Sequence, residues 1–205
     1  MRWLLRITVL LAVLAIAAAG IAAAWLATSE SALAWLAARA VAVAGGRLEI
    51  TDVRGFLAGT IRVGRLRYED EDFRMTVEEV ALEPVLVAVL VRRVELKTLA
   101  ARNLEVVIKP TPPATPDSLA PPLAVGIGRA AIGRIVVRSD PDEIAFDDVS
   151  FAYEGSATRH ALTEVKGRSA FGTLAGVVAF GAARSFPASG SASLMRADAK
   201  LPVAF

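Results

Sequence analysis

Residues 73–82 read Phe-Arg-Met-Thr-Val-Glu-Glu-Val-Ala-Leu, and apolar and polar side chains alternate along them. Successive side chains of a β-strand point to opposite faces, so this alternation predicts a strand with one apolar face. The phase changes at Glu78 and Glu79, after which Val80 and Leu82 continue the apolar face. An extra residue is typical of a β-bulge, which bends a strand. The stretch therefore predicts a bent strand that buries one face.

The same pattern returns 69 residues further along the chain. Val63-Gly64-Arg65-Leu66 recurs as Ile132-Gly133-Arg134-Ile135, and residues 75–82 match residues 144–151. A third block in this register pairs Glu95-Leu96-Lys97 with Glu164-Val165-Lys166. Repeats of long period build arrays in which each unit stacks on the one before. Because the unit consists of strands, we expect a mainly β protein with an elongated, curved sheet.

Other stretches complete the prediction of strands and connections. Alternation also marks the strands around 48–51, 61–64, 103–109 and 144–153. Residues 83–91 are mostly apolar, and we expect a short helix there that caps the sheet, with Pro84 in its first turn. Prolines crowd residues 111–122 and predict a loop. Later glycines separate short apolar stretches and predict sharp bends, at Gly167, Gly172, Gly176, Gly181 and Gly190.

The N-terminus predicts a membrane anchor. Residues 7–27 carry no charge and would form a helix about 31 Å long, enough to cross a hydrocarbon core of roughly 30 Å. Arg2 and Arg6 precede this stretch and Glu30 follows it, which predicts a cytoplasmic N-terminus and an exported remainder. The alternative is a cleaved signal peptide, because small residues at 22–24 would suit cleavage.

These patterns divide the chain into consecutive parts. We expect a cytoplasmic N-terminus (1–6), a transmembrane signal-anchor helix (7–27), a short periplasmic helix and turn (28–46), a first strand repeat (47–110), a Pro-rich loop (111–122) and a second strand repeat (123–205). The final residues look like the middle of another strand. We therefore expect the sequence to be the N-terminal part of a longer protein.

Little in the composition points to catalysis. The chain has no cysteine, a net charge of +2 and a single histidine, His160, which we expect at the surface or in a loop. The acidic residues 69–72 could form a cation site, but a solvated hairpin loop is the better interpretation, and residues 140–143 occupy the equivalent loop. No nucleotide, zinc or triad motif occurs. We expect no enzyme, cofactor, metal or nucleic-acid partner.

The apolar face of such a sheet can be arranged in two ways. A second layer could cover it, as in a β-sandwich. Alternatively, the sheet could curl into an open trough lined by apolar side chains. A packed core and a lipid-binding groove have the same hydropathy, so periodicity alone leaves both open, although a packed core is the general expectation.

The order of features resembles the TamB and AsmA-like family of bridge-type lipid transfer proteins, at its N-terminal part. An anchor is followed by Thr28-Ser29-Glu30-Ser31 and a helix, then by 48–50, 55–61 and 63–68, and by 101–108 before a Pro-rich loop. The match covers nearly the whole chain but rests on degenerate apolar patterns. It implies repeating β-groove (β-taco) units with an apolar interior, in a bacterial inner-membrane protein whose bulk lies in the periplasm.

The resemblance also implies a function and partners. These are phospholipid transport between the inner and outer membranes, support of outer-membrane biogenesis, and an Omp85-type (TamA-like) outer-membrane partner bound through a C-terminal region absent here. The groove-lining candidates are Leu66, Phe73, Met75, Val77, Val80 and Leu82, with their repeat counterparts Ile135, Ile144, Phe146, Val149 and Phe151. A scaffold or chaperone for outer-membrane proteins, acting by β-augmentation, is the alternative, and a plain anchored β-sandwich is a third.

Overall fold

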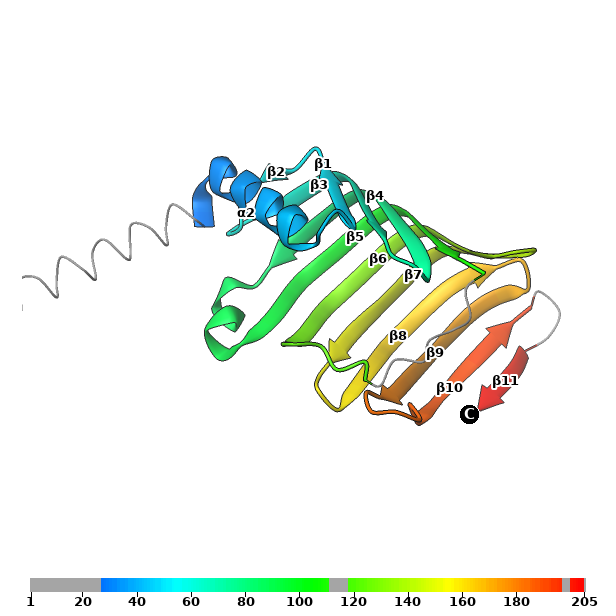
Figure 1. The fold of residues 1–205 in the computed structure, drawn as a ribbon. Coiled ribbons are helices and arrows are strands. Elements are labelled where there is room, and N and C mark those ends of the chain that lie inside the picture. The colour runs from blue at the N-terminus through cyan, green and yellow to red at the C-terminus, as the bar shows by residue number, and fades with distance from the viewer. Residues whose placement is uncertain (1–26, 111–117, 197–199, 205) are drawn as a thin grey trace, which may run out of the picture.

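A computed structural model describes residues 27–110, 118–196 and 200–204 of the chain, and these form one open, curved β-sheet (Figure 1). The prediction of a mainly β protein is confirmed. The helical elements are α2 (Glu30–Val43) and the 3-10 helix η1 (Leu86–Val91). The strands are β1 (Leu48–Thr51), β2 (Arg54–Gly55), β3 (Ile61–Glu69), β4 (Phe73–Pro84), β5 (Arg93–Ile108), β6 (Ala124–Ser139), β7 (Asp142–Gly155), β8 (Arg159–Ser169), β9 (Gly172–Gly181), β10 (Ala188–Met195) and β11 (Lys200–Ala204).

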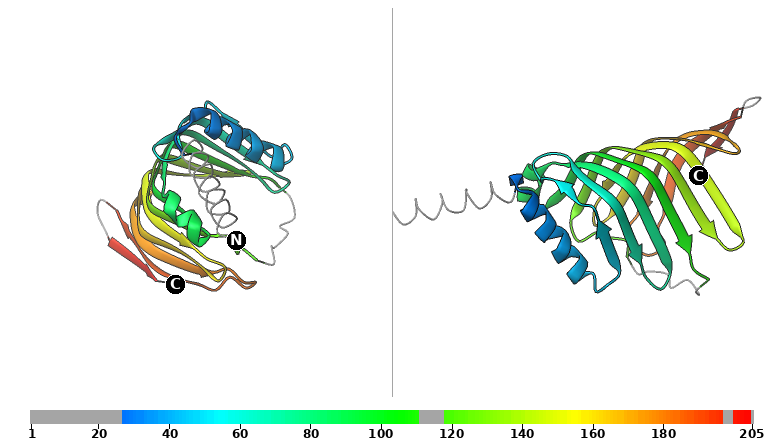
Figure 2. Two further views of the ribbon diagram at one scale, coloured as in Figure 1. Left: turned by 90° about the vertical axis from the view of Figure 1, so that its left-hand side faces the viewer. Right: turned by 90° about the horizontal axis from the view of Figure 1, so that it is seen from above.

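The strands follow their chain order across the sheet. Its path runs β1-β3-β4-β5-β6-β7-β8-β9-β10-β11, and β2 pairs with β3 beside it. Neighbours are antiparallel except β5 and β6, which are parallel. The chain must therefore return along the full length of β5 before β6 begins. Seen from the α2 end, the sheet forms an arc that is open on one side (Figure 2).

The change of phase in the sequence coincides with a real kink in the strands. Glu79 has a φ of 51° and its repeat counterpart Asp148 a φ of 52°. This left-handed conformation is costly for residues other than glycine, so the surrounding ladder must hold it in place. The glycines beside these kinks have no room for a side chain, because a Cβ at Gly64 would lie 2.8 Å from the Asp52 side chain and one at Gly133 2.8 Å from the Arg102 carbonyl oxygen.

The first two repeat blocks form hairpins of identical register. Leu66 pairs with Val77 in β3–β4, and their counterparts Ile135 and Phe146 pair in β6–β7. The third block does not follow this register. Pro84 pairs with Leu96, whereas Tyr153 pairs with Leu162, three residues before the counterpart of Leu96. The repeat thus holds for the two hairpins and loosens in the strand that follows each.

Helix α2 covers the beginning of the sheet. Its Leu33 is buried against Ile61, Val63 and Val80. Ser29 is the N-cap residue, but its hydroxyl bonds to that of Ser31 rather than to the helix backbone, and the helix ends before the left-handed Gly45 and Gly46. No helix among the described residues is long and apolar enough to cross a membrane. The expected span at 7–27 lies outside the described residues apart from Ala27 at its end.

The expected short helix after β4 is present as η1, but the place of Pro84 and the bends at the later glycines were predicted wrongly. Pro84 does not begin a helix; it is the last residue of β4, because the Val85 N–H still donates to the Glu95 carbonyl and η1 begins only at Leu86. The glycines from 167 onward do not break the sheet into bends. They lie within β8, β9 and β10 or at the ends of β9, and among them only Gly172 has a positive φ, 135°.

The acidic stretches lie where expected. Residues 70–72 connect β3 to β4, and residues 140–141 connect β6 to β7. The Asp70 carboxylate accepts the backbone N–H groups of Asp72 and Phe73 at 3.0 and 2.9 Å. A carboxylate that closes its own turn in this way is a structural element of the hairpin.

Candidate functional site: the apolar face of the sheet

The predicted lining residues of the first hairpin lie on one face of the sheet. Cross-strand partners share a face, and the register pairs apolar residues with one another throughout. The pairs in β3–β4 are Leu66 with Val77, Tyr68 with Met75, Val63 with Val80, and Ile61 with Leu82. Phe73 continues the same face of β4 and pairs with Ile108 of β5.

The second hairpin repeats this arrangement. Its pairs are Ile135 with Phe146, Val137 with Ile144, Ile132 with Val149, and Ala130 with Phe151. The parallel pairing of β5 with β6 joins the two hairpins, since Leu104 pairs with Val77 on one side and Ile135 on the other. One row therefore crosses five strands without a polar residue. Its members are Leu66, Val77, Leu104, Ile135 and Phe146.

The kinks determine which way the sheet bends. Val77 and Val80 share the apolar face although two residues separate them, so Glu78 and Glu79 both lie on the polar face. An extra residue lengthens the side that carries it, and the strand bends toward the opposite side. The polar face is therefore convex and the apolar face lines the inside of the arc.

Ion pairs line the convex side of this bend. The pairs are Arg65–Glu78 (3.4 Å), Arg102–Glu79 (2.6 Å), Arg134–Asp147 (3.7 Å) and Arg168–Asp148. All these side chains are largely exposed, so each pair adds at most about 1 kcal/mol to stability. They also place an arginine of a neighbouring strand beside each carboxylate of the two consecutive acidic pairs, Glu78-Glu79 and Asp147-Asp148.

The apolar face is only partly sealed. Of the eleven predicted lining residues, Val80 is buried beneath Leu33 of α2, Ile144 is 48% exposed, and the other nine are half-buried. No large side chain in the described part of the chain is fully buried. Within those residues no second sheet lies on this face, so the sandwich solution is not the one adopted there.

His160 does not lie in a surface loop, and that expectation was wrong. It is the second residue of β8, is 5% exposed, and stacks on Phe180 of β9 with ring centroids 4.8 Å apart. Its Nε2 lies 3.1 Å from the Leu119 carbonyl oxygen and its Nδ1 2.7 Å from the Tyr153 hydroxyl. A carbonyl can only accept, so Nε2 carries the hydrogen and, in the neutral ring, Nδ1 accepts from Tyr153. Burial raises the pKa of Tyr153.

His160 thereby fastens a segment that we call the strap, residues 118–123. The Leu119 N–H donates to the Ala182 carbonyl at 2.9 Å, and Ser118 bridges to Ala183. The strap is the last part of the connection that leads back to β6. It contacts His160 near the start of β8 and Ala182 just after the end of β9.

Further lining residues escaped the sequence analysis. In β5 they are Leu99, Leu104, Val106 and Ile108, and in β8 to β10 they are Leu162, Val165, Leu174, Val178, Phe180 and Leu194. The alternation in residues 103–109 was a sufficient signal for most of the first group. The second group was hidden because Gly167, Gly176 and Gly190 occupy the apolar face between its members and interrupt the pattern.

A polar cluster lies at the edge of the sheet where β3 and β5 end and β4 begins. Glu69 binds Arg74 through both oxygens at 2.9 Å, Arg67 at 2.8 Å and Lys109 at 3.0 Å. These contacts, above all the one with Arg74, hold the pKa of Glu69 far below its usual range. The backbone N–H of Phe73 lowers the pKa of Asp70. The cluster thus ties three strand ends together by charge.

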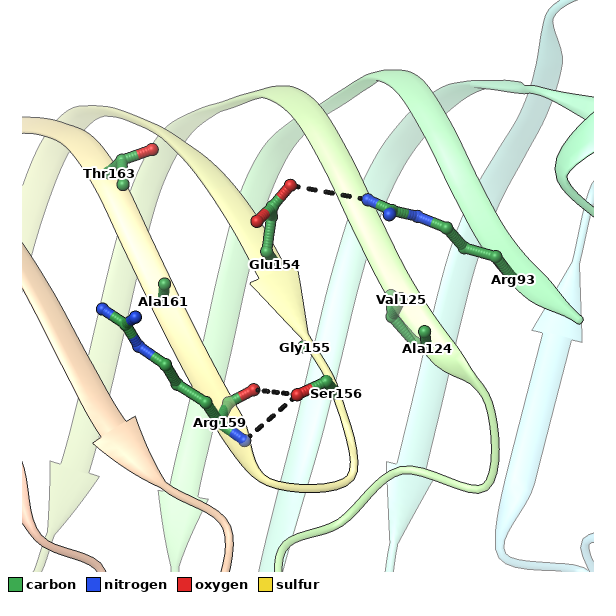
Figure 3. A pocket seen from close by; sticks show the side chains of 9 residues that line it. All are labelled: Arg93, Ala124, Val125, Glu154, Gly155, Ser156, Arg159, Ala161 and Thr163. Atoms are coloured by element: carbon green, nitrogen blue, oxygen red, sulfur yellow. Dashed lines mark hydrogen bonds and ion pairs between the residues drawn. The ribbon is translucent and has the colours of Figure 1, made fainter. Parts of the chain in front are cut away.

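The polar face carries a shallow hollow of about 350 Å³ near the start of β6 (Figure 3). Arg93 reaches Glu154 at 3.5 Å across it and Glu95 at 3.6 Å. The Ser156 hydroxyl donates to the Arg159 carbonyl and accepts its N–H, both at 3.1 Å. These polar groups serve neighbouring strands and a turn, so the hollow offers a substrate no activated nucleophile.

Comparison with known proteins identifies no relative: no family model, no curated protein and no solved structure matches the chain. The features of the chain itself must therefore indicate its function. Its leading feature is a concave apolar face that crosses the sheet from β3 to β10.

Proposed function

We propose that this chain is part of a bridge protein, anchored in the bacterial inner membrane and exposed to the periplasm, that carries phospholipid along its apolar trough to the outer membrane. The resemblance to the TamB and AsmA-like family suggests this direction and the link with outer-membrane biogenesis. The observation that carries the proposal is the unbroken apolar row from Leu66 to Phe146 on the inside of the arc.

A lipid that leaves a bilayer must keep its acyl chains out of water. Each CH₂ exposed to water costs roughly 0.8 kcal/mol, so a whole acyl chain costs on the order of 10 kcal/mol. A continuous trough replaces the bilayer interior for the chains while the headgroup stays in water through the open side. The eight strands from β3 to β10, at about 4.8 Å spacing, would give the chains a path of roughly 34 Å along the sheet.

The lining also suits sliding better than storage. Specific polar anchors would hold one lipid in one place, whereas the row through Leu66, Leu104 and Phe146 offers only dispersion contacts. Binding is then similar at each step, which keeps the barriers between steps low. A carrier of this kind needs no catalytic residue and no cofactor.

The alternative function is a scaffold for outer-membrane proteins that works by β-augmentation. One observation favours it: the described sheet is an open path that does not close on itself, so it has edge strands to which a further strand could be added. This function predicts backbone pairing with unfolded peptides at the edge rather than acyl chains on the apolar face.

Photocrosslinking in living cells tests the proposal. A photoreactive side chain at Met75 or Phe146 should give phospholipid adducts, and the same probe at Thr76 or Ala145 is the matched control, because these neighbours point to the polar face. Adducts only with neighbouring side chains would reject the trough. Peptide adducts at β11 without lipid adducts inside would favour the scaffold.

A further inference from the structure

The connection between β4 and β5 exposes an unusual amount of apolar surface. Residues 85–91 read Val-Leu-Val-Ala-Val-Leu-Val, followed by Arg92 and Arg93. Ala88 of η1 is buried at 7%, while Val87 and Val91 turn outward with exposed fractions of 73% and 75%. Together with Val43 of α2, at 74%, they are the most exposed large apolar residues in the described chain. A turn that served only to reverse the chain would not need such residues.

This surface lies at the end of the molecule where the described chain begins. Helix α2 and η1 both face the viewer in the left panel of Figure 2, and both lie at the left of Figure 1. The Ala58 N–H donates to the Ala27 carbonyl at 2.8 Å, which ties the first described residue to this end. Trp35 of α2 is 59% exposed and Phe56 of the β2–β3 loop 43% exposed here as well.

The charges at this end suit an anionic surface. Arg92 follows η1 directly and Arg39 lies on α2, and both side chains are exposed. Neither forms an ion pair with any residue within 27–110, 118–196 or 200–204. Exposed valines beside an unpaired arginine match the composition by which peripheral proteins enter the interface of a bilayer that contains anionic lipid.

We infer that η1 is a membrane-docking turn: Val87 and Val91 insert into the headgroup region of a bilayer containing anionic phospholipid, and Arg92 pairs with its phosphates. This inference rests on the proposed anchoring through residues 7–27, which would deliver this end of the sheet to the membrane surface. Docking would hold the first strands of the trough against the bilayer, so that a lipid could pass from one to the other without crossing water.

Spin labels on the full chain in phospholipid nanodiscs test the inference. The protein has no cysteine, so a single Val87→Cys variant carries one nitroxide at a known place. Its accessibility to oxygen, which concentrates in lipid, is compared with its accessibility to a water-soluble nickel complex. Phe171→Cys is the matched control, because Phe171 is an equally apolar, 66% exposed residue on the β8–β9 turn.

The expected result is a lipid-like ratio for the Val87 label and an aqueous ratio for the Phe171 label in discs of phosphatidylethanolamine and phosphatidylglycerol. Adding Arg92→Gln should lower the ratio of docked to undocked protein about fivefold in these discs and leave it unchanged without the anionic lipid. An aqueous Val87 label overturns the inference. A label shielded from both reagents also overturns it, since protein would then cover η1. Lipid adducts at Met75 and Phe146 report on the trough separately, so either proposal can fail alone.

Discussion

Glu79 shows how a single backbone conformation shapes this sheet. Its φ of 51° allows two consecutive polar residues on the convex face, and Asp148 does the same in the second hairpin. Both positions hold an acidic residue rather than glycine. The carboxylate can bind an arginine on the next strand, as Glu79 binds Arg102 at 2.6 Å, and this contact offsets part of the cost of the backbone conformation. A β-branched residue tolerates a positive φ least.

We therefore predict that Glu79→Val destabilises the protein by about 1–2 kcal/mol more than Glu78→Val, measured by equilibrium unfolding in urea. Glu78 is the matched control, because it lies next in the same strand, has an ordinary φ and also pairs with an exposed arginine. The loss of an ion pair is common to both variants, and Glu78→Val also loses the hydrogen bond that Asn103 Nδ2 donates at 3.1 Å, so a larger cost at residue 79 reports the backbone. Equal unfolding free energies would mean that the ladder does not hold residue 79 in the left-handed region.

The strap depends on the one buried histidine. His160 is held by the ring of Phe180 and donates to the Leu119 carbonyl, so it joins the strap to the sheet. His160→Ala removes that donor and leaves the bonds of Ser118 and Leu119 to residues 182 and 183 to hold the segment. Losing a buried hydrogen bond costs about 1–3 kcal/mol.

Hydrogen exchange at the Leu119 amide should therefore become about tenfold faster or more in His160→Ala, because the strap opens more often. Tyr153→Phe is the control: it removes a bond to Nδ1 but keeps the ring stack and the bond to Leu119. Unchanged exchange in His160→Ala would show that the bonds of residues 118 and 119 to the β9–β10 loop hold the strap alone.

The strands marked by clear alternation were predicted correctly, and their neighbours in the sheet were not. Alternation placed Met75 and Phe146 on apolar faces and its change of phase located the kinks at Glu79 and Asp148, since both are local properties of the chain. The parallel pairing of Leu104 with Ile135 is not local, because the Pro-rich segment separates the two residues in sequence. His160 was misplaced for the same reason: the carbonyl that it binds belongs to that distant segment.

The glycines of β9 show a second limit. Gly176 sits on the apolar face opposite Ala192 and Val165, so the face continues there without a side chain to reveal it. Period-two analysis detects apolar side chains and takes a missing one as a break. The last strands therefore looked like bends, although they extend the same concave surface with a shallower lining.

In a trough that spans the sheet from β3 to β10, each lipid passes every strand in turn, so a barrier at one strand slows the whole passage. Phe146→Asp places a carboxylate in the row that crosses five strands, where an acyl chain would lose an apolar contact and meet a charge. The loss of a phenylalanine contact, about 1.5–3 kcal/mol, should slow phospholipid arrival at the outer membrane roughly tenfold to a hundredfold, measured by pulse labelling. Phe146 is half-buried on an open face, so the variant should still fold.

Met75→Asp, one hairpin away, should slow transport by a similar factor. The loss in the double variant should be far smaller than the product of the two single losses, because each lipid meets two comparable barriers one after the other. Ala145→Asp, on the convex face, should leave transport unchanged. Two outcomes would contradict the trough: variants that unfold would make the face a sealed core, and multiplicative losses in the double variant would mean that both residues hold one lipid in a single site. Series behaviour is what separates a conduit from a binding pocket built on the same sheet.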